Sequence, residues 1–121
     1  MVGYNMGTVE SYFADIVWER EPISTLELIE ICKEKFNWKR TTTYTVLKRL
    51  CEGGVFKLEN STVTSLISRE NFYSAKSESF VEESFNGSLP AFIAAFTKRK
   101  KLTKKEIDEI RKMIDDYKPE E

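Results

Sequence analysis

Histidine is absent from this 121-residue sequence, and cysteine occurs only twice. Without histidine, the chain lacks the commonest zinc ligand and the side chain that most often acts as a general base near neutral pH. Cys32 and Cys51 form no C-x-x-C pair, so we expect two buried thiols in a reducing compartment rather than a metal or redox site. Glu82 and Glu83 are adjacent and diverge by about 100° on a helix, so they cannot converge on one substrate. We therefore expect no enzyme and no cofactor.

Long apolar runs are also missing. No run approaches the roughly 18 residues that a membrane span needs, and the N-terminus carries no secretory signal. We therefore expect a cytoplasmic protein without direct membrane binding. Glycine is scarce, at five residues, whereas 40% of the residues are apolar. This composition suits one folded chain of ordinary domain size and excludes wholesale disorder.

Neither sign of charge predominates, because 19 basic and 20 acidic side chains give a net charge of −1. The distribution is uneven, because the segment from Trp38 to Leu50 contains four basic residues and no acidic one. A local charge of +4 in a nearly neutral chain needs an explanation, for which a merely solvated face and a contact with an anionic partner are both open.

Two helices are predicted before this basic segment. The first runs from about Thr8 to Glu19 and ends before Pro22. A capping box formed by Ser24 and Glu27 begins the second, for which Asn37 is an acceptable terminator. The apolar positions expected to face the core are Val9, Phe13, Ile16 and Val17 in the first helix and Leu26, Ile29, Cys32 and Phe36 in the second.

A third helix is predicted from about Arg40 or Thr41 to Glu52, where Gly53 and Gly54 end it. At 100° per residue, its residues divide into two faces, with Tyr44 at the boundary. We expect Thr43, Val46, Leu47 and Leu50 on the buried face and Thr41, Thr42, Thr45, Lys48 and Arg49 on the outward face.

Two short strands should follow, Val55–Leu58 and Val63–Ile67, joined by a turn that contains Asn60 and Ser61. Three helices followed by a β-hairpin form the element order of a winged helix-turn-helix. The hairpin carries Glu59 and no basic residue between Lys57 and Arg69.

The remaining chain should return to helix from about Ser77, with a second helix over Leu89–Thr97 and a third that starts at a capping box formed by Thr103 and Glu106. Their apolar stripes are larger than three short helices can hide, so we expect a partner subunit to cover them. The fold class is thus mainly α with a small β-hairpin wing, divided into a winged-helix DNA-binding domain over residues 1–76 and a helical dimerisation region over residues 77–121. The candidate dimerisation residues are Phe92, Phe96, Ile107, Ile110 and Ile114.

A second basic run, Lys98–Lys101, precedes the last helix. Charge runs of this kind are usually solvated, so we interpret it as a connector, with a secondary electrostatic role as the alternative.

Residues 38–50 resemble the recognition helix of the penicillinase and methicillin-resistance repressor family, which reads approximately W-S-x-S-T-V-x-T-L-L-x-R-L. Trp18 and Glu19 are similar to the end of that family's first helix, and Leu102–Met113 to its final dimerisation helix. The residues that agree in the recognition segment are Trp38, Thr42, Thr45, Leu47, Arg49 and Leu50.

This resemblance implies a homodimeric transcriptional repressor whose winged helix binds double-stranded operator DNA. It also implies release by a membrane sensor protease that cuts an Asn-Phe bond, which corresponds here to Ala95 and Phe96. The asparagine is therefore replaced. Wings of this family often hold Lys or Arg for a phosphate, so the comparison implies weak phosphate contacts for the hairpin of this chain, which carries Glu59. The tail also lacks the paired cysteine ligands of the family's copper-responsive branch.

A helix that enters the major groove presents short polar groups to base edges and cations to phosphates. Arg49 leaves two interpretations open, a DNA contact or an ion pair with Glu52. A winged helix that binds protein rather than DNA is the alternative function. The candidate DNA-binding residues are Lys39, Arg40, Thr41, Thr42, Tyr44, Thr45, Lys48 and Arg49.

Overall fold

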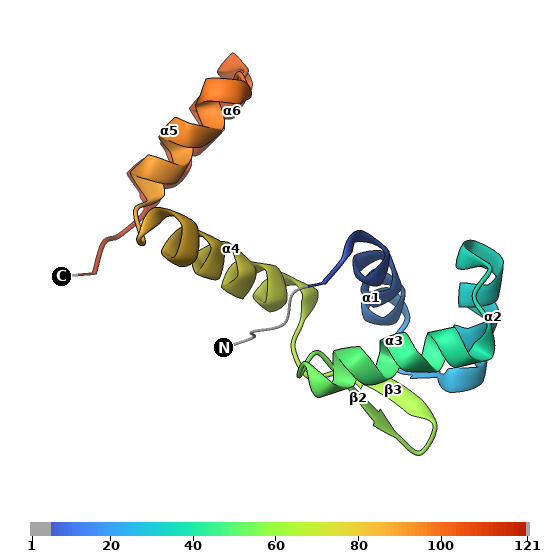
Figure 1. Cartoon of the computed structure of the whole chain (residues 1–121). Helices are drawn as coiled ribbons and strands as arrows, with labels where there is room; N and C mark the ends of the chain where they lie inside the picture. Colours follow the sequence, from blue (N-terminus) through green and yellow to red (C-terminus); the bar gives the residue numbers. More distant parts are fainter. Residues whose placement is uncertain (1–5, 121) are drawn as a thin grey trace. The chain divides into compact units, whose positions relative to one another are not determined.

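The computed structural model describes residues 6–120 and forms a winged helix followed by further helices (Figure 1). The chain divides into two units, one up to Ser79 and one from Phe80 onward. The elements are α1 (Thr8–Arg20), β1 (Ile23–Ser24), α2 (Thr25–Phe36), α3 (Arg40–Glu52), β2 (Phe56–Glu59), β3 (Thr62–Ser65), α4 (Arg69–Phe85), α5 (Leu89–Arg99) and α6 (Lys104–Asp116).

The core of the first unit lies beneath α3, and the two predicted faces of this helix are confirmed. Its four inward residues are buried, its predicted outward residues are exposed, and Tyr44 is half-buried. Trp38 lies just before α3, with its ring 5.9 Å from Phe13 and 4.8 Å from Phe36. The buried apolar residues are Phe13, Ala14, Ile16, Val17, Ile23, Leu28, Cys32, Val46, Leu47, Leu50, Val55, Phe56, Val63 and Phe72.

The predicted core faces of α1 and α2 are partly wrong. Val9 is exposed, and in α2 the exposed residue is Leu26, whereas Leu28 is fully buried. The reason is the attachment of the start of α2 to the sheet, where the Thr25 amide donates to the Ser61 carbonyl at 3.0 Å. This attachment fixes the rotation of α2 about its axis. Of the predicted capping box, the structure contains the bond in which the Ser24 hydroxyl accepts from the Glu27 amide.

The hairpin is confirmed, but it belongs to a three-stranded antiparallel sheet with the order β1-β3-β2. Asn60 and Ser61 alone form the turn, and both have positive φ, at 52° and 59°. This is the geometry of a two-residue type I′ turn, which suits the twist of a hairpin. The additional strand, β1, has only two residues, so no sequence periodicity could identify it.

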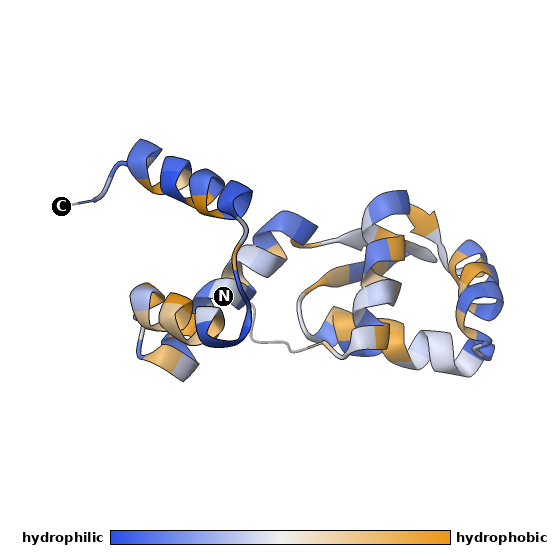
Figure 2. Ribbon diagram, turned by 90° about the horizontal axis from the view of Figure 1, so that it is seen from above, coloured by the Kyte–Doolittle hydropathy of each residue, from blue (hydrophilic) through white to orange (hydrophobic). Residues whose placement is uncertain are grey.

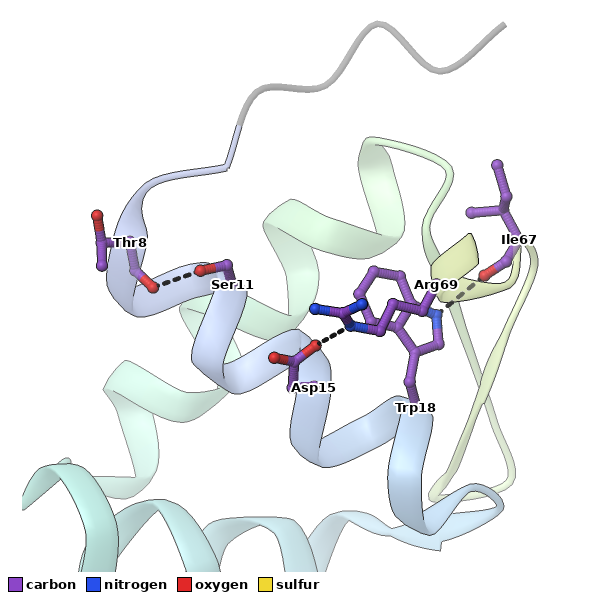
Figure 3. Close-up of polar contacts among 6 residues, drawn as sticks. All are labelled: Thr8, Ser11, Asp15, Trp18, Ile67 and Arg69. Atoms are coloured by element: carbon purple, nitrogen blue, oxygen red, sulfur yellow. Dashed lines mark hydrogen bonds and ion pairs between the residues drawn. The ribbon is translucent and has the colours of Figure 1, made fainter. Parts of the chain in front are cut away.

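The helix predicted from Ser77 begins eight residues earlier, at Arg69, so the predicted domain boundary lies inside α4. Contacts with α1 stabilise this early start (Figure 3). The Trp18 indole Nε1 donates to the Ile67 carbonyl at 3.0 Å, and Arg69 Nε lies 2.8 Å from an Asp15 carboxylate oxygen. Phe72 is fully buried, with its ring 5.7 Å from that of Trp18.

In the second unit, helices α5 and α6 contain no buried side chain. Figure 2 shows apolar colouring along one side of α6 and hydrophilic colouring along the other. Within residues 6–120, no helix has the length and apolar character needed to cross a membrane.

We expect Leu28→Ala to lower the free energy of unfolding by about 2–5 kcal/mol, because the substitution leaves a cavity in the core. Leu26→Ala, two residues away in the same helix, should change it by less than about 0.5 kcal/mol because Leu26 is 65% exposed. Urea denaturation of both variants measures the difference. Equal losses would show that the assigned rotation of α2 is wrong.

Candidate nucleic-acid interface

The outward face of α3 offers hydroxyl groups and cations, with Glu52 at the last position of the helix as its acidic residue. At 100° per residue, Thr41, Thr45 and Lys48 fall in the middle of the exposed arc. Lys39, the N-cap residue, has no side-chain acceptor to offer the amides of the first turn. These amides therefore keep their capacity to bind an anion such as phosphate.

Hydrogen bonds within α3 determine what two of its threonines can present. The Thr45 hydroxyl donates to the Thr41 carbonyl at 2.9 Å, and the Thr43 hydroxyl donates to the Lys39 carbonyl at 3.4 Å. Thr43 is buried, whereas Thr45 is exposed. With its proton engaged, Thr45 presents a methyl group and an acceptor oxygen, which suit a thymine methyl and a base amino group.

Near the wing, α3 presents a cation stacked on an aromatic ring. The Arg40 guanidinium lies over the Tyr44 ring, 5.6 Å from its centroid. Tyr44 also borders a hollow of about 340 Å³ between α3 and β2, together with Leu47, Lys48, Cys51 and Leu58. The exposed side chain of Leu58 is a feature that the sequence analysis did not identify. Leu58 follows the buried Phe56 by two positions, and this spacing is the signal that places both side chains on the same face of β2.

Of the two interpretations left open for Arg49, the structure contains an ion pair, but its partner is Glu10 of α1 at 3.0 Å rather than Glu52. The two Glu10 oxygens have different partners, because Oε2 accepts from Arg49 and Oε1 accepts from the Gly7 amide at 3.1 Å. This carboxylate therefore connects the start of α1 to the edge of α3. The pair joins residues 39 positions apart, a separation at which sequence spacing gives no signal.

The wing supplies little positive charge. Lys57 Nζ lies 3.7 Å from a carboxylate oxygen of Glu59, and both side chains are exposed. Glu59 thus offsets the charge of the basic residue of β2, in agreement with the expected weakness of wing contacts with phosphate.

Neither cysteine is prepared for nucleophilic chemistry. Burial raises the pKa of the Cys32 thiol to about 11. Burial also raises the pKa of Cys51, and the charge of Glu52 raises it further, against a hydrogen bond from the Leu58 backbone that lowers it. Both side chains are therefore neutral thiols near pH 7, which are poor nucleophiles and metal ligands. Across residues 6–120, no cluster of three or more Cys, Asp or Glu side chains could hold a metal ion.

A second feature, the apolar groove between α5 and α6, contains the residues expected to form a dimer. It measures about 420 Å³ and has Leu102 and Ile93 among its lining residues. Ala95 is exposed, and the Phe96 carbonyl accepts from the Lys100 amide at 3.1 Å, so the predicted cleavage site lies in intact helix. All five candidate dimerisation residues line the groove: Phe92, Phe96, Ile107, Ile110 and Ile114.

Comparison with known proteins agrees with this arrangement. The profile of the family described as "Penicillinase repressor" matches residues 6–116. The chain is 25% identical over 107 residues to the penicillinase repressor of Bacillus licheniformis, which covers 85% of this chain and 84% of that protein. It is 24% identical over 115 residues to the methicillin resistance regulatory protein MecI of Staphylococcus aureus strain Mu50, covering 92% and 94% of the two chains. MecI of Mammaliicoccus sciuri is 23% identical over the same length.

The Arg49–Glu10 pair is partly exposed, so we expect it to contribute only about 0.2–1 kcal/mol to the free energy of unfolding. A double-mutant cycle with Arg49→Gln and Glu10→Gln, measured by urea denaturation, gives this coupling energy. Glutamine at position 10 keeps an acceptor for the Gly7 amide, so the cycle isolates the ion pair. A coupling energy of zero would mean that the pair does not hold Arg49 against α1.

Proposed function

Because the chain belongs to the penicillinase repressor family, we propose that it is a dimeric transcriptional repressor that binds operator DNA through the outward face of α3. The observation that carries this proposal is the exposed face itself. It combines hydroxyls, an aromatic ring and cations on a helix whose opposite face is buried. The names of the relatives, penicillinase repressor and methicillin resistance regulatory protein, support regulation of transcription.

The proposed roles follow from position on α3. Thr41 and Thr42, in the first turn, bind a phosphate together with the first-turn amides. Tyr44 and Thr45 meet base edges. Arg49 acts as a positioning residue, because its guanidinium is engaged by Glu10. The remaining cations, Lys39, Arg40 and Lys48, bind phosphates.

Dimerisation is proposed through the groove between α5 and α6. From Phe80 to Glu120 no side chain is buried, although the segment contains many large apolar residues. A second copy of the chain gives these residues the core that one copy lacks, and twofold pairing presents two α3 helices to the two half-sites of an operator.

Proteolytic release by a membrane sensor remains a proposal for this chain. A cut between Ala95 and Phe96 would divide α5 and remove part of the groove. Proteases prefer exposed, irregular backbone, so this cut requires α5 to unwind first. Ala95 stands where the family has asparagine. Incubation with a cognate sensor, followed by mass spectrometry of the fragments, measures whether the bond between Ala95 and Phe96 is cut.

A mobility-shift titration against the region upstream of the protein's own gene tests the proposed function. We expect sequence-selective, salt-sensitive retardation. Retardation that is equal on operator and random duplex, or absent from both, would favour the alternative of a winged helix that binds protein.

We expect Lys48→Ala to weaken binding to operator and random duplex alike, because a phosphate contact carries no sequence information. The slope of log Kobs against log salt should fall by about 0.9 per subunit. Lys33→Ala removes an exposed cation of α2 and should leave the slope unchanged. An unchanged slope for Lys48→Ala would remove this residue from the phosphate contacts.

We expect Ile110→Glu to weaken dimerisation by about 100-fold or more, because it places an unpaired charge in the apolar groove. Sedimentation velocity over a concentration series measures the change. Leu66→Glu changes an exposed apolar residue of the first unit in the same way and should leave the dimer intact. A dimer that persists in Ile110→Glu would place the subunit contact elsewhere.

A further inference from the structure

The segment from Lys98 to Lys105, here termed the basic connector, joins α5 to α6. It contains six cations and no acid in eight consecutive positions. No other segment of this length in the chain carries so much charge of one sign. Its cations are Lys98, Arg99, Lys100, Lys101, Lys104 and Lys105.

The cations of the basic connector are exposed, and none belongs to an ion pair within residues 6–120. The nearest acid in sequence, Glu106, is engaged in the capping box of α6, where its Oε1 accepts from the Thr103 amide at 3.0 Å. Hydrogen bonds from Thr103, and to a smaller extent the charge of Lys100, lower the pKa of Glu106, while its hydrogen bonds hold the carboxylate at the start of α6. Five cations elsewhere in the described residues form ion pairs with acids, as in Lys112–Asp116 and Arg69–Asp15.

Two of these cations also occupy positions that the fold itself disfavours. Lys104 and Lys105 lie in the first turn of α6, where the helix dipole is positive. Acidic residues are favoured at such positions, and cations are disfavoured there at low ionic strength. Nothing compensates for this unfavourable placement if the connector is merely solvated, whereas a bound anionic partner offsets it.

The winged-helix unit as a whole has no excess of positive charge. Residues 1–79 contain ten basic and eleven acidic side chains. On α3 the cations outside ion pairs are Lys39, Arg40 and Lys48, and the Lys57 charge of the wing is offset by Glu59. Sequence-independent affinity for DNA depends on the number of phosphates neutralised. The basic connector is the largest concentration of unpaired cations that the described chain contains.

From this distribution we infer that the basic connector is a second phosphate-binding element, which contacts the DNA backbone without reading sequence. The inference rests on the proposed function for the choice of DNA as the polyanion. In a dimer, two connectors bring twelve cations to the complex. The connector then contributes affinity, and α3 contributes selectivity.

The test compares two full-length variants of equal net charge. The connector variant carries Lys98→Gln, Arg99→Gln, Lys100→Gln and Lys101→Gln, and leaves the Thr103 cap intact. The control variant carries Arg20→Gln, Lys33→Gln, Lys35→Gln and Lys118→Gln, all at exposed positions and outside the ion pairs. Affinity for operator and for a random duplex is measured by fluorescence anisotropy at several salt concentrations.

If each connector binds two phosphates, the dimer loses four contacts and the salt slope falls by about 3.6. Raising the salt from 50 to 200 mM should then weaken the wild type about 150-fold more than the connector variant. The loss should be the same on operator and random duplex, and the control variant should keep the wild-type slope. Lys100→Gln with Lys101→Gln changes only residues between the two helices and should show about half of the effect, which guards against misfolding of the larger variant.

An unchanged slope in both connector variants overturns the inference, and so does an equal fall in the control variant, which would indicate net charge alone. Binding of the wild type to phosphatidylserine vesicles, lost in the connector variant while the DNA slope is unchanged, would also overturn it by assigning the segment to a membrane surface. The proposed function is refuted by a different outcome, namely a wild type that binds operator and random duplex equally well. In that case a flatter salt slope of the connector variant on random duplex still supports the inference about the basic connector.

Discussion

The burial of one side of α3 is the constraint on which the rest of the molecule depends. Leu47 and Leu50 are almost fully buried, and Trp38 packs against Phe13 and Phe36 just before the helix begins. A helix held in this way cannot rotate about its axis without exposing apolar surface, at about 25 cal/mol per Å². The buried residues of α3 therefore determine the positions of its outward threonines and cations.

Much of this arrangement could be predicted from the sequence, because helical periodicity alone assigns residues to the two faces of α3. Features set by tertiary contact could not. The burial of Leu28 rather than Leu26 depends on a backbone bond to the turn of the wing, and the Arg49–Glu10 pair joins distant segments. The early start of α4 depends on the burial of Phe72 against Trp18, in a stretch whose own residues are mostly polar.

The two units of the chain achieve order by different means. The first has a complete apolar core and a sheet, whereas the second has capped helices whose apolar side chains line an open groove. In the second unit, capping at Ser88 and Thr103 fixes where the helices begin, while nothing within residues 80–120 covers their apolar sides. The sequence predicted the Thr103 cap and the apolar stripes, but not the Ser88 cap or the meeting of five separated residues in one groove.

The open groove has a consequence for the proposed dimeric repressor. In such a dimer the second unit is covered only by its partner, so by mass action its order depends on the number of copies in the cell. Below the dissociation constant of the dimer, the amount of paired protein varies with the square of the total, and occupancy of a palindromic site varies just as steeply. For the proposed repressor, a modest fall in copy number is then enough to derepress the regulated gene, without any change at the outward face of α3.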